Sequence, residues 1–157
     1  MERKILESAI EICSYDELPA DDRKLVDMAV EMTSHSYSVY SHFNVGSALL
    51  LDNGEIITGC NQENVAFSVT VCAERSALFA AGSRYPDVPV RTIAIAARGT
   101  DGELLENPIS PCGTCRQAMI ETEIRFGQEL RILLHGRKNI YIIEGIKNLM
   151  PLSFKQL

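Results

Sequence analysis

The chain has 157 residues, of which 46% are hydrophobic and 23% charged, and its formal net charge is −6. This length fits one domain spanning residues 1–157, and the composition excludes an intrinsically disordered chain. The acidic balance argues against a nucleic-acid partner, and no apolar stretch is long enough to predict a membrane span. The charged start lacks the apolar region of a secretory signal, and the cysteine count of five is odd. Both features favour a reducing, cytoplasmic location.

The first half of the chain predicts a helix and a hairpin. Residues 1–18 form an N-terminal extension whose apolar pattern fits either a helix or a strand. Pro19 opens a predicted helix that runs to about residue 35. Asn53-Gly54 is typical of a tight turn, which predicts a hairpin of two strands over 45–51 and 55–58.

The second half alternates helices and strands. A polar loop over 61–70 precedes an Ala-rich segment, which predicts a helix over 71–81 that stops at Gly82. Further on, helices are expected over 112–122 and 145–150, and strands over 92–97, 131–134 and 140–143. An opening hairpin followed by this alternation predicts an α/β sandwich on a mixed five-stranded sheet.

Three cysteines lie at two predicted helix starts. Cys112 and Cys115 are one helical turn apart, so both sulfurs can face one point. Cys72 offers a third sulfur at the start of the other helix, and a helix N-terminus favours the thiolate that metal binding needs. Three protein ligands leave one tetrahedral position open, which is typical of catalytic zinc. We therefore expect one Zn²⁺ per chain. Cys112 and Cys115 alone would also fit a structural metal or a redox pair.

The residues around these cysteines indicate the chemistry. A ligand followed two residues later by Glu, and then a Pro-Cys-x-x-Cys segment, is the signature of zinc deaminases. Cys72-Ala73-Glu74 and Pro111-Cys112-Gly113-Thr114-Cys115 match both halves. In this pattern Glu74 moves protons and does not bind the metal, while zinc activates a water. Without the zinc set, Glu74 would be an ordinary first-turn carboxylate.

From about Tyr37 to Phe154 the chain resembles the small homo-oligomeric cytidine deaminases. The resemblance lies in five segments: Tyr40-Ser41-His42-Phe43-Asn44-Val45-Gly46, Gly59-Cys60-Asn61-Gln62-Glu63-Asn64, Cys72-Ala73-Glu74-Arg75, Pro111-Cys112-Gly113-Thr114-Cys115-Arg116-Gln117 and Leu149-Met150-Pro151-Leu152-Ser153-Phe154. It implies a three-layer α/β/α fold, a homotetramer, and conversion of cytidine and deoxycytidine to uridine and deoxyuridine in pyrimidine salvage.

The resemblance also implies substrate contacts. Asn61 and Glu63 would hydrogen-bond the ribose hydroxyls, and Phe43 would line the nucleoside pocket. The backbone N–H of Ala73 would meet the base carbonyl, and Phe154 would reach the base bound by a neighbouring subunit. Without the resemblance, the two phenylalanines fit core or tail-docking roles, and the two polar residues fit a turn.

Two arginines next to the motif carry a further hypothesis. Three thiolates on Zn²⁺ leave a net charge of −1, which weakens the metal as a Lewis acid. Arg75 and Arg116 could donate hydrogen bonds to the sulfurs and compensate this charge. The histidines, His35, His42 and His135, are interpreted as structural or solvated rather than as ligands. Cys13 and Cys60 are interpreted as small apolar residues.

Two departures from the family pattern bear on the substrate. Ser38-Val39 replaces the usual Ala-Pro, and the segment Phe67-Ser68-Val69-Thr70 replaces the usual Tyr-Pro-x-Gly. An alternative is therefore a deaminase for another small aminopyrimidine or a nucleoside antibiotic. A polynucleotide-editing enzyme ranks lower, because of the acidic charge and because Cys72 replaces the usual His. From a different class comes a noncatalytic, zinc-stabilised nucleoside-binding protein.

Overall fold

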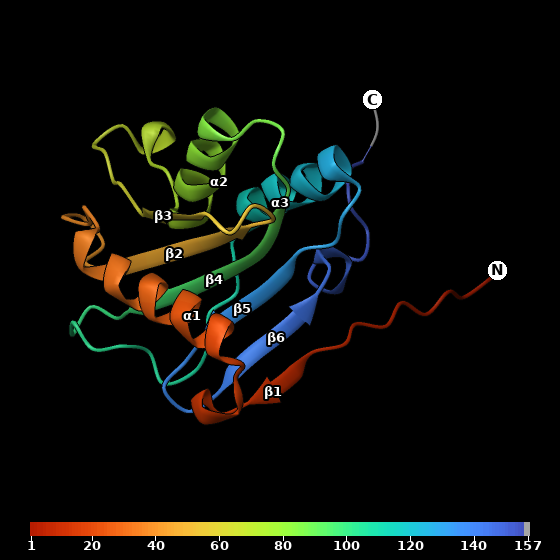
Figure 1. Ribbon diagram of the computed structural model, residues 1–157, viewed down its shortest axis with the longest axis horizontal. Helices are drawn as coiled ribbons and strands as arrows, with labels where there is room; N and C mark the ends of the chain where they lie inside the picture. The colour runs from red at the N-terminus through yellow and green to blue at the C-terminus, as the bar shows by residue number, and fades with distance from the viewer. Residues whose placement is uncertain (156–157) are drawn as a thin grey trace.

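The computed structural model describes residues 1–155 and is built on one mixed β-sheet. Within these residues the strand order is β1-β6-β5-β4-β2-β3 (Figure 1). All neighbouring pairs are antiparallel except β4 and β5, which are parallel. The strands are β1 (Glu11–Cys13), β2 (Asn44–Leu51), β3 (Ile56–Cys60), β4 (Val90–Arg98), β5 (Arg131–His135) and β6 (Ile140–Glu144).

Helices cover both faces of this sheet. One face carries α1, and the other carries α2 and α3 (Figure 1). The helices are α1 (Ala20–Met32), α2 (Ala73–Arg84) and α3 (Gly113–Phe126), with 3₁₀ turns at Tyr15–Glu17, Thr33–His35, Phe67–Val69 and Ile146–Asn148. The predicted three-layer α/β/α sandwich is thus confirmed. Over the described residues, no helix is both long and apolar enough to cross a membrane.

The number of strands differs from the prediction. The sheet has six strands rather than five, because part of the N-terminal extension forms β1 and pairs with β6. The preceding residues run as an extended segment away from the sheet (Figure 1). The predicted stop at Gly82 is wrong, since α2 continues to Arg84. The short helix expected over 145–150 is a single 3₁₀ turn, Ile146–Asn148.

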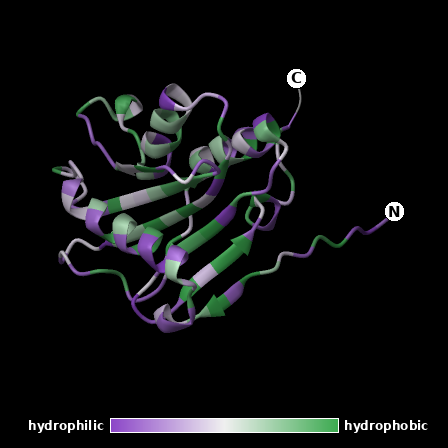
Figure 2. Ribbon diagram, viewed as in Figure 1, coloured by the Kyte–Doolittle hydropathy of each residue, from purple (hydrophilic) through white to green (hydrophobic). Residues whose placement is uncertain are grey.

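The two core layers differ in the size of their side chains. Along β4, Ile93 and Ile95 point to the α2 and α3 side, whereas Ala94 and Ala96 point toward α1. This alternation follows the two-residue period of a strand. Figure 2 shows the resulting concentration of hydrophobic residues in the central strands. The small alanines let α1 pack close to the sheet, while the bulkier residues fill the layer under the other two helices.

Strand direction brings the starts of α2 and α3 together. Both β3 and β4 pair antiparallel with β2, so they run in the same direction. Helix α2 follows β3 and helix α3 follows β4. The N-termini of both helices therefore lie at the carboxyl ends of β3 and β4, the end of the strands at which open α/β sheets bind their ligands.

A glycine seats α2 directly on the sheet. A Cβ at Gly59 would lie 2.6 Å from the backbone nitrogen of Ala77 and 2.8 Å from the carbonyl oxygen of Ala73. These atoms belong to helix backbone and cannot rotate aside. Gly59→Ala should therefore destabilise the protein by about 1–3 kcal/mol, as overpacking does.

Thermal denaturation checks this prediction, with Gly82→Ala as a matched control. The nearest atom to a Cβ at Gly82 is the Arg125 side-chain nitrogen at 3.7 Å. Because alanine is favoured over glycine inside a helix, Gly82→Ala should raise stability by up to about 1 kcal/mol. Equal Tm values for Gly59→Ala and the unaltered protein would contradict the close approach.

Candidate metal centre and its surroundings

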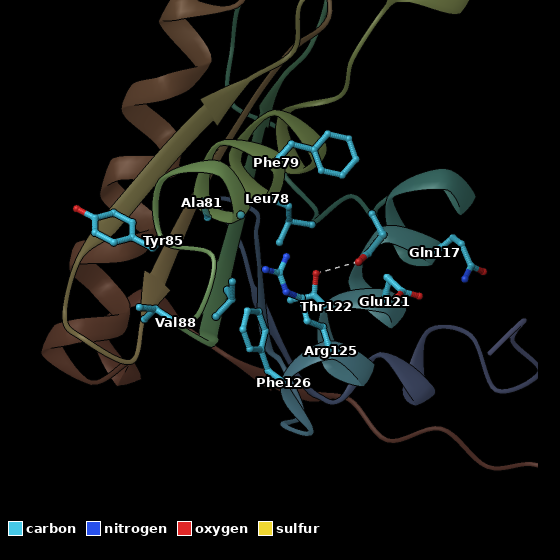
Figure 3. Close-up of a pocket in the computed structure, with 13 residues that line it drawn as sticks. Leu78, Phe79, Ala81, Tyr85, Val88, Gln117, Glu121, Thr122, Arg125 and Phe126 are labelled. Carbon is cyan, nitrogen blue, oxygen red and sulfur yellow. Dashed lines mark hydrogen bonds between the residues drawn. The ribbon is translucent and has the colours of Figure 1, made fainter. Parts of the chain in front are cut away.

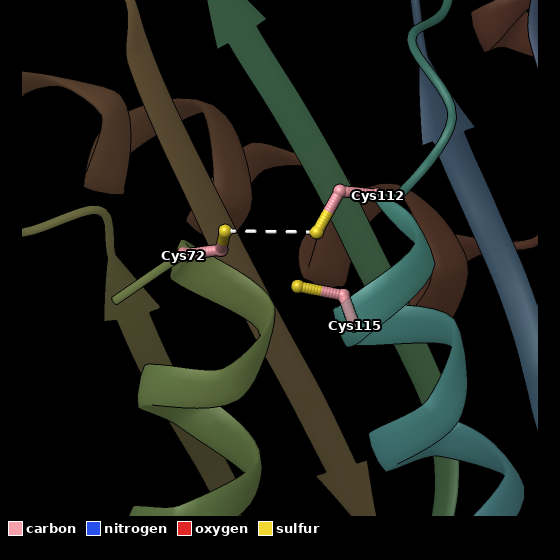
Figure 4. Close-up of side chains that lie close together, drawn as sticks. All are labelled: Cys72, Cys112 and Cys115. Carbon is pink, nitrogen blue, oxygen red and sulfur yellow. Dashed lines mark hydrogen bonds between the residues drawn. The ribbon is translucent and has the colours of Figure 1, made fainter. Parts of the chain in front are cut away.

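The sulfur atoms of Cys72, Cys112 and Cys115 converge between the starts of α2 and α3 (Figure 4). All three lie within 4.8 Å of one another, and the sulfurs of Cys72 and Cys112 are 3.8 Å apart. Tetrahedral zinc with Zn–S distances of about 2.3 Å separates its sulfurs by about 3.8 Å. The spacing of this cluster therefore fits a tetrahedral metal with thiolate ligands.

Helix geometry favours ionised sulfurs in the cluster. Cys72 and Cys112 are the N-cap residues of α2 and α3, and Cys115 is buried in the first turn of α3. The unpaired N–H groups and dipole of a helix start stabilise negative charge. Hydrogen bonds from Cys115 and Arg75 lower the pKa of the Cys72 thiol to about 5. The hydrogen bond to Cys72 and burial raise the pKa of Cys115, so Cys72 is the first of this pair to ionise.

Glu74 lies beside the sulfurs in the first turn of α2. Its side chain is buried, with the residue only 4% exposed. Burial is the main cause that raises the pKa of this carboxyl, and the nearby Cys72 sulfur acts in the same direction. A carboxyl group that holds a proton more readily than usual is suited to accept and return protons near neutral pH.

The two arginines of the motif have different partners. The Nη2 of Arg75 lies 3.8 Å from the Cys72 sulfur and 3.4 Å from the Thr70 carbonyl oxygen. Arg116 instead donates to the carbonyl oxygens of Pro111, at 2.8 Å, and Leu149, at 2.7 Å. The structure thus brings Arg75 to the sulfurs, whereas the guanidinium of Arg116 ties the C-terminal segment to the start of α3.

The segment Asn61–Glu63 lies next to the cysteine cluster. Gln62 pairs through its backbone with Val71, the residue before Cys72. The Asn61 amide accepts from the Val45 N–H at 2.8 Å and donates to the Phe43 carbonyl at 2.9 Å. The Glu63 carboxylate accepts hydrogen bonds from the Tyr40–Ser41 segment. These hydrogen bonds therefore bring Phe43, Asn61 and Glu63 together next to the Gln62–Val71 pairing, beside Cys72.

The remaining candidate contacts lie on either side of the cluster. Ala73 is fully buried at the start of α2. Phe154 is 64% exposed, and its carbonyl oxygen accepts a hydrogen bond of 2.9 Å from the Gln117 side chain on α3. Ser41 was not predicted as a site residue, although it lies in the segment 40–46 that carries part of the family resemblance.

A hollow of about 530 Å³ lies away from the cysteines, between α2 and α3 (Figure 3). It is mostly apolar, and Glu121 and Arg125 are the charged residues of its lining. Its lining includes Leu78, Phe79, Tyr85, Val88, Ala118 and Phe126. Phe79 is 60% exposed there.

Comparison with known proteins agrees with this geometry. The family profile of the cytidine and deoxycytidylate deaminase zinc-binding region matches residues 19–126. The chain belongs to this family. The matched region includes all three cysteines and Glu74, and it begins after β1. The chain therefore contains the zinc-binding region of this deaminase family.

Curated relatives and solved structures point the same way. The cytidine deaminase of Sporosarcina psychrophila is 44% identical over 101 residues, which cover 64% of this chain and 69% of the relative. That of Halalkalibacterium halodurans is 40% identical over 103 residues, 64% and 71% of the two chains. A crystal structure of cytidine deaminase from Burkholderia pseudomallei superposes with a TM-score of 0.72 at 32% identity, covering 83% of this chain and 97% of that one.

Proposed function

We propose that this protein is a zinc-dependent cytidine deaminase, which converts cytidine and deoxycytidine to uridine and deoxyuridine and releases ammonia. The observation that carries the proposal is the cluster of three sulfurs within 4.8 Å of one another, with the buried Glu74 beside it. The curated relatives named cytidine deaminase support the choice of a cytosine nucleoside. Such an activity would belong to pyrimidine salvage in the cytoplasm.

The chain's own residues divide the work. Cys72, Cys112 and Cys115 would hold one zinc ion, which when bound supplies a Lewis acid that makes water nucleophilic near neutral pH. Glu74 takes a proton from the attacking water and gives it to ring nitrogen N3. It then takes the second proton of that water and delivers it to the amino group, which leaves as ammonia. Water and cytidine are thereby converted to uridine and ammonia, with Glu74 returned to its starting state.

The neighbouring residues would orient the nucleoside. The N–H of Ala73 belongs to the first turn of α2, where backbone donors lack a partner within the helix, so it can meet the base carbonyl. Asn61 and Glu63 would bind the ribose hydroxyls, and Phe43 would pack beside the nucleoside. Their position beside Cys72, through the Gln62–Val71 pairing, supports these roles.

A metal count and an activity assay on the purified protein test the proposal. We expect one zinc per chain, a fall in the ultraviolet absorbance of cytidine, and one ammonia released per uridine formed. Turnover of another aminopyrimidine but not of cytidine would favour the alternative substrate. The exposed Phe67 and Val69 in the altered loop support this alternative. Nucleoside binding with no ammonia release would instead indicate a noncatalytic binding protein. A metal-free, fully active protein would overturn the zinc assignment.

We further propose that the active assembly is a homotetramer. Cys112 is exposed in the single chain, although a site of this chemistry works best when water is excluded. The apolar hollow between α2 and α3, with Phe79 at its surface, offers a face that a second copy would cover. The exposed Phe154 would then reach the nucleoside in a neighbouring subunit.

The role of Phe154 can be tested by substitution. Because a ring stacked on a base contributes about 1–3 kcal/mol, Phe154→Ala should raise the KM for cytidine about ten- to hundred-fold and leave zinc in place. Leu152→Ala, at another exposed tail position, is the control and should change KM little. An active monomer in sedimentation experiments, together with an unchanged KM for Phe154→Ala, would return this ring to an ordinary tail contact.

The contact of Arg75 with sulfur gives another expected result. Partners of metal ligands typically affect metal affinity or activity ten- to hundred-fold. Arg75→Ala should therefore reduce kcat/KM for cytidine at least about ten-fold and weaken zinc retention against a chelator. Arg84→Ala, an exposed arginine at the end of the same helix, should change neither. Equal zinc retention and activity in both variants would exclude charge compensation by Arg75.

A further inference from the structure

A tight turn next to the cysteine cluster surrounds the carboxylate of Glu63. One of its oxygens accepts hydrogen bonds from the backbone N–H of Tyr40, at 2.8 Å, and of Ser41, at 3.2 Å. The other oxygen accepts from the hydroxyl of Ser41. The Ser41 side chain is thus the one side-chain donor to Glu63 found among the described residues.

The Ser41 hydroxyl is itself held in one orientation. Its oxygen accepts a hydrogen bond of 3.1 Å from the backbone N–H of Phe43. A hydroxyl has one hydrogen to donate, and with its oxygen engaged by Phe43 that hydrogen is directed to Glu63. Between these residues lies His42, which at φ 55° is the one non-glycine residue of positive φ in the part of the chain that the structure describes. Such a conformation is disfavoured and needs surrounding bonds to persist, and the Ser41 contacts supply them.

Glu63 keeps room for one more partner. A carboxylate offers about four acceptor positions, and the turn occupies three of them. The hydrogen bond from Ser41 is the main cause that lowers the pKa of Glu63, so the group stays ionised. The carboxylate is therefore fixed in direction, charged, and able to accept one hydrogen bond from a ligand hydroxyl.

We infer that Ser41 is a positioning residue for the nucleoside sugar: its hydroxyl fixes the Glu63 carboxylate so that the free acceptor position meets a ribose hydroxyl. This inference rests on the proposed function, because it assigns Glu63 to the sugar. Ser41 acts only through Glu63 and does not itself touch the substrate.

The test compares the KM values of the Ser41→Ala variant for two nucleosides. The KM for cytidine should rise about ten-fold, the loss expected for one hydrogen bond to a charged group, while kcat stays within about two-fold. The KM for 2′,3′-dideoxycytidine, which lacks both ribose hydroxyls that Glu63 could bind, should change less than about two-fold. Ser41→Thr keeps the hydroxyl and should recover much of the affinity for cytidine.

A double-mutant cycle and a matched control complete the design. In a Glu63→Gln background, Ser41→Ala should have little further effect, because both changes remove one interaction. Ser34→Ala removes an exposed hydroxyl that donates to the Glu31 carbonyl at 2.7 Å, outside the site, and should leave both KM values unchanged.

The outcomes separate the inference from the proposed function. If the unaltered protein does not deaminate cytidine, the proposed function falls and the inference falls with it. If it does, an equal rise in KM for both nucleosides, or effects of Ser41→Ala and Glu63→Gln that simply add, would overturn the role of Ser41 alone. A selective loss for cytidine with strong coupling to Glu63 would establish it.

Discussion

Replacing Glu74 with glutamine should lower the kcat for cytidine about 10³- to 10⁴-fold, at the upper end of what a positioned acid–base group contributes. The amide has nearly the same shape as the carboxyl but cannot carry protons between water, ring nitrogen and amino group. The side chain is buried and lies next to the three sulfurs, but it is not one of the residues that would hold the metal. The fold and the zinc content should therefore be preserved while turnover is lost.

Single-turnover kinetics with a parallel metal count measure this effect. Glu31→Gln is the matched control, since it makes the same chemical change at an exposed position on α1, away from the cysteines and from the hollow between α2 and α3. It should keep the parental rate. Deamination by Glu74→Gln at near the parental rate would show that another group transfers the protons.

Removing one sulfur should abolish metal retention. Cys112→Ala leaves two thiolates, and loss of a direct ligand should weaken zinc binding by more than the roughly hundred-fold typical of outer-shell partners. Because Cys112 is exposed, its truncation creates no core cavity, and the folded structure should survive. Metal analysis after dialysis against a chelator should find far less than one zinc per chain, with activity lost in proportion.

The control for this variant is Cys13→Ala. Cys13 is half-buried in β1, at the opposite edge of the sheet from β3. It should retain zinc and activity. Full zinc content in Cys112→Ala would mean that the metal is held elsewhere.

Each half of the metal centre was predictable from sequence because its geometry is local, whereas the meeting of the two halves depends on the strand directions in the sheet. Cys112 and Cys115 share one helix turn, and Cys72 and Arg75 share another, so helical spacing alone places each pair on one face. Arg116 follows directly after Cys115, and consecutive residues on a helix point in different directions. Its contact with the distant Leu149 carbonyl depends on tertiary packing, which no local pattern encodes.

The same distinction explains the differences in the fold. The pattern of the N-terminal extension allowed a helix or a strand, and the choice was made by pairing with β6, which lies far along the chain. Gly82 has a low helix propensity, yet α2 continues through it to Arg84, since packing against the sheet outweighs propensity. The role inferred for Ser41 depends on hydrogen bonds between two loops and likewise leaves no trace in the spacing of residues.

Two glycines on neighbouring strands let helices on both faces of the sheet contact its main chain directly. In the β2–β3 register, Gly46 lies opposite Cys60, next to Gly59. A Cβ at Gly46 would collide with the backbone of α1, just as one at Gly59 would collide with that of α2. At this point the helices on both faces rest on the sheet main chain, without an intervening layer of side chains. The position of Cys72 relative to the sheet is therefore set by main-chain contact, whereas that of Cys112 and Cys115 depends on the side chains that α3 packs into the core, Met119 and Ile120.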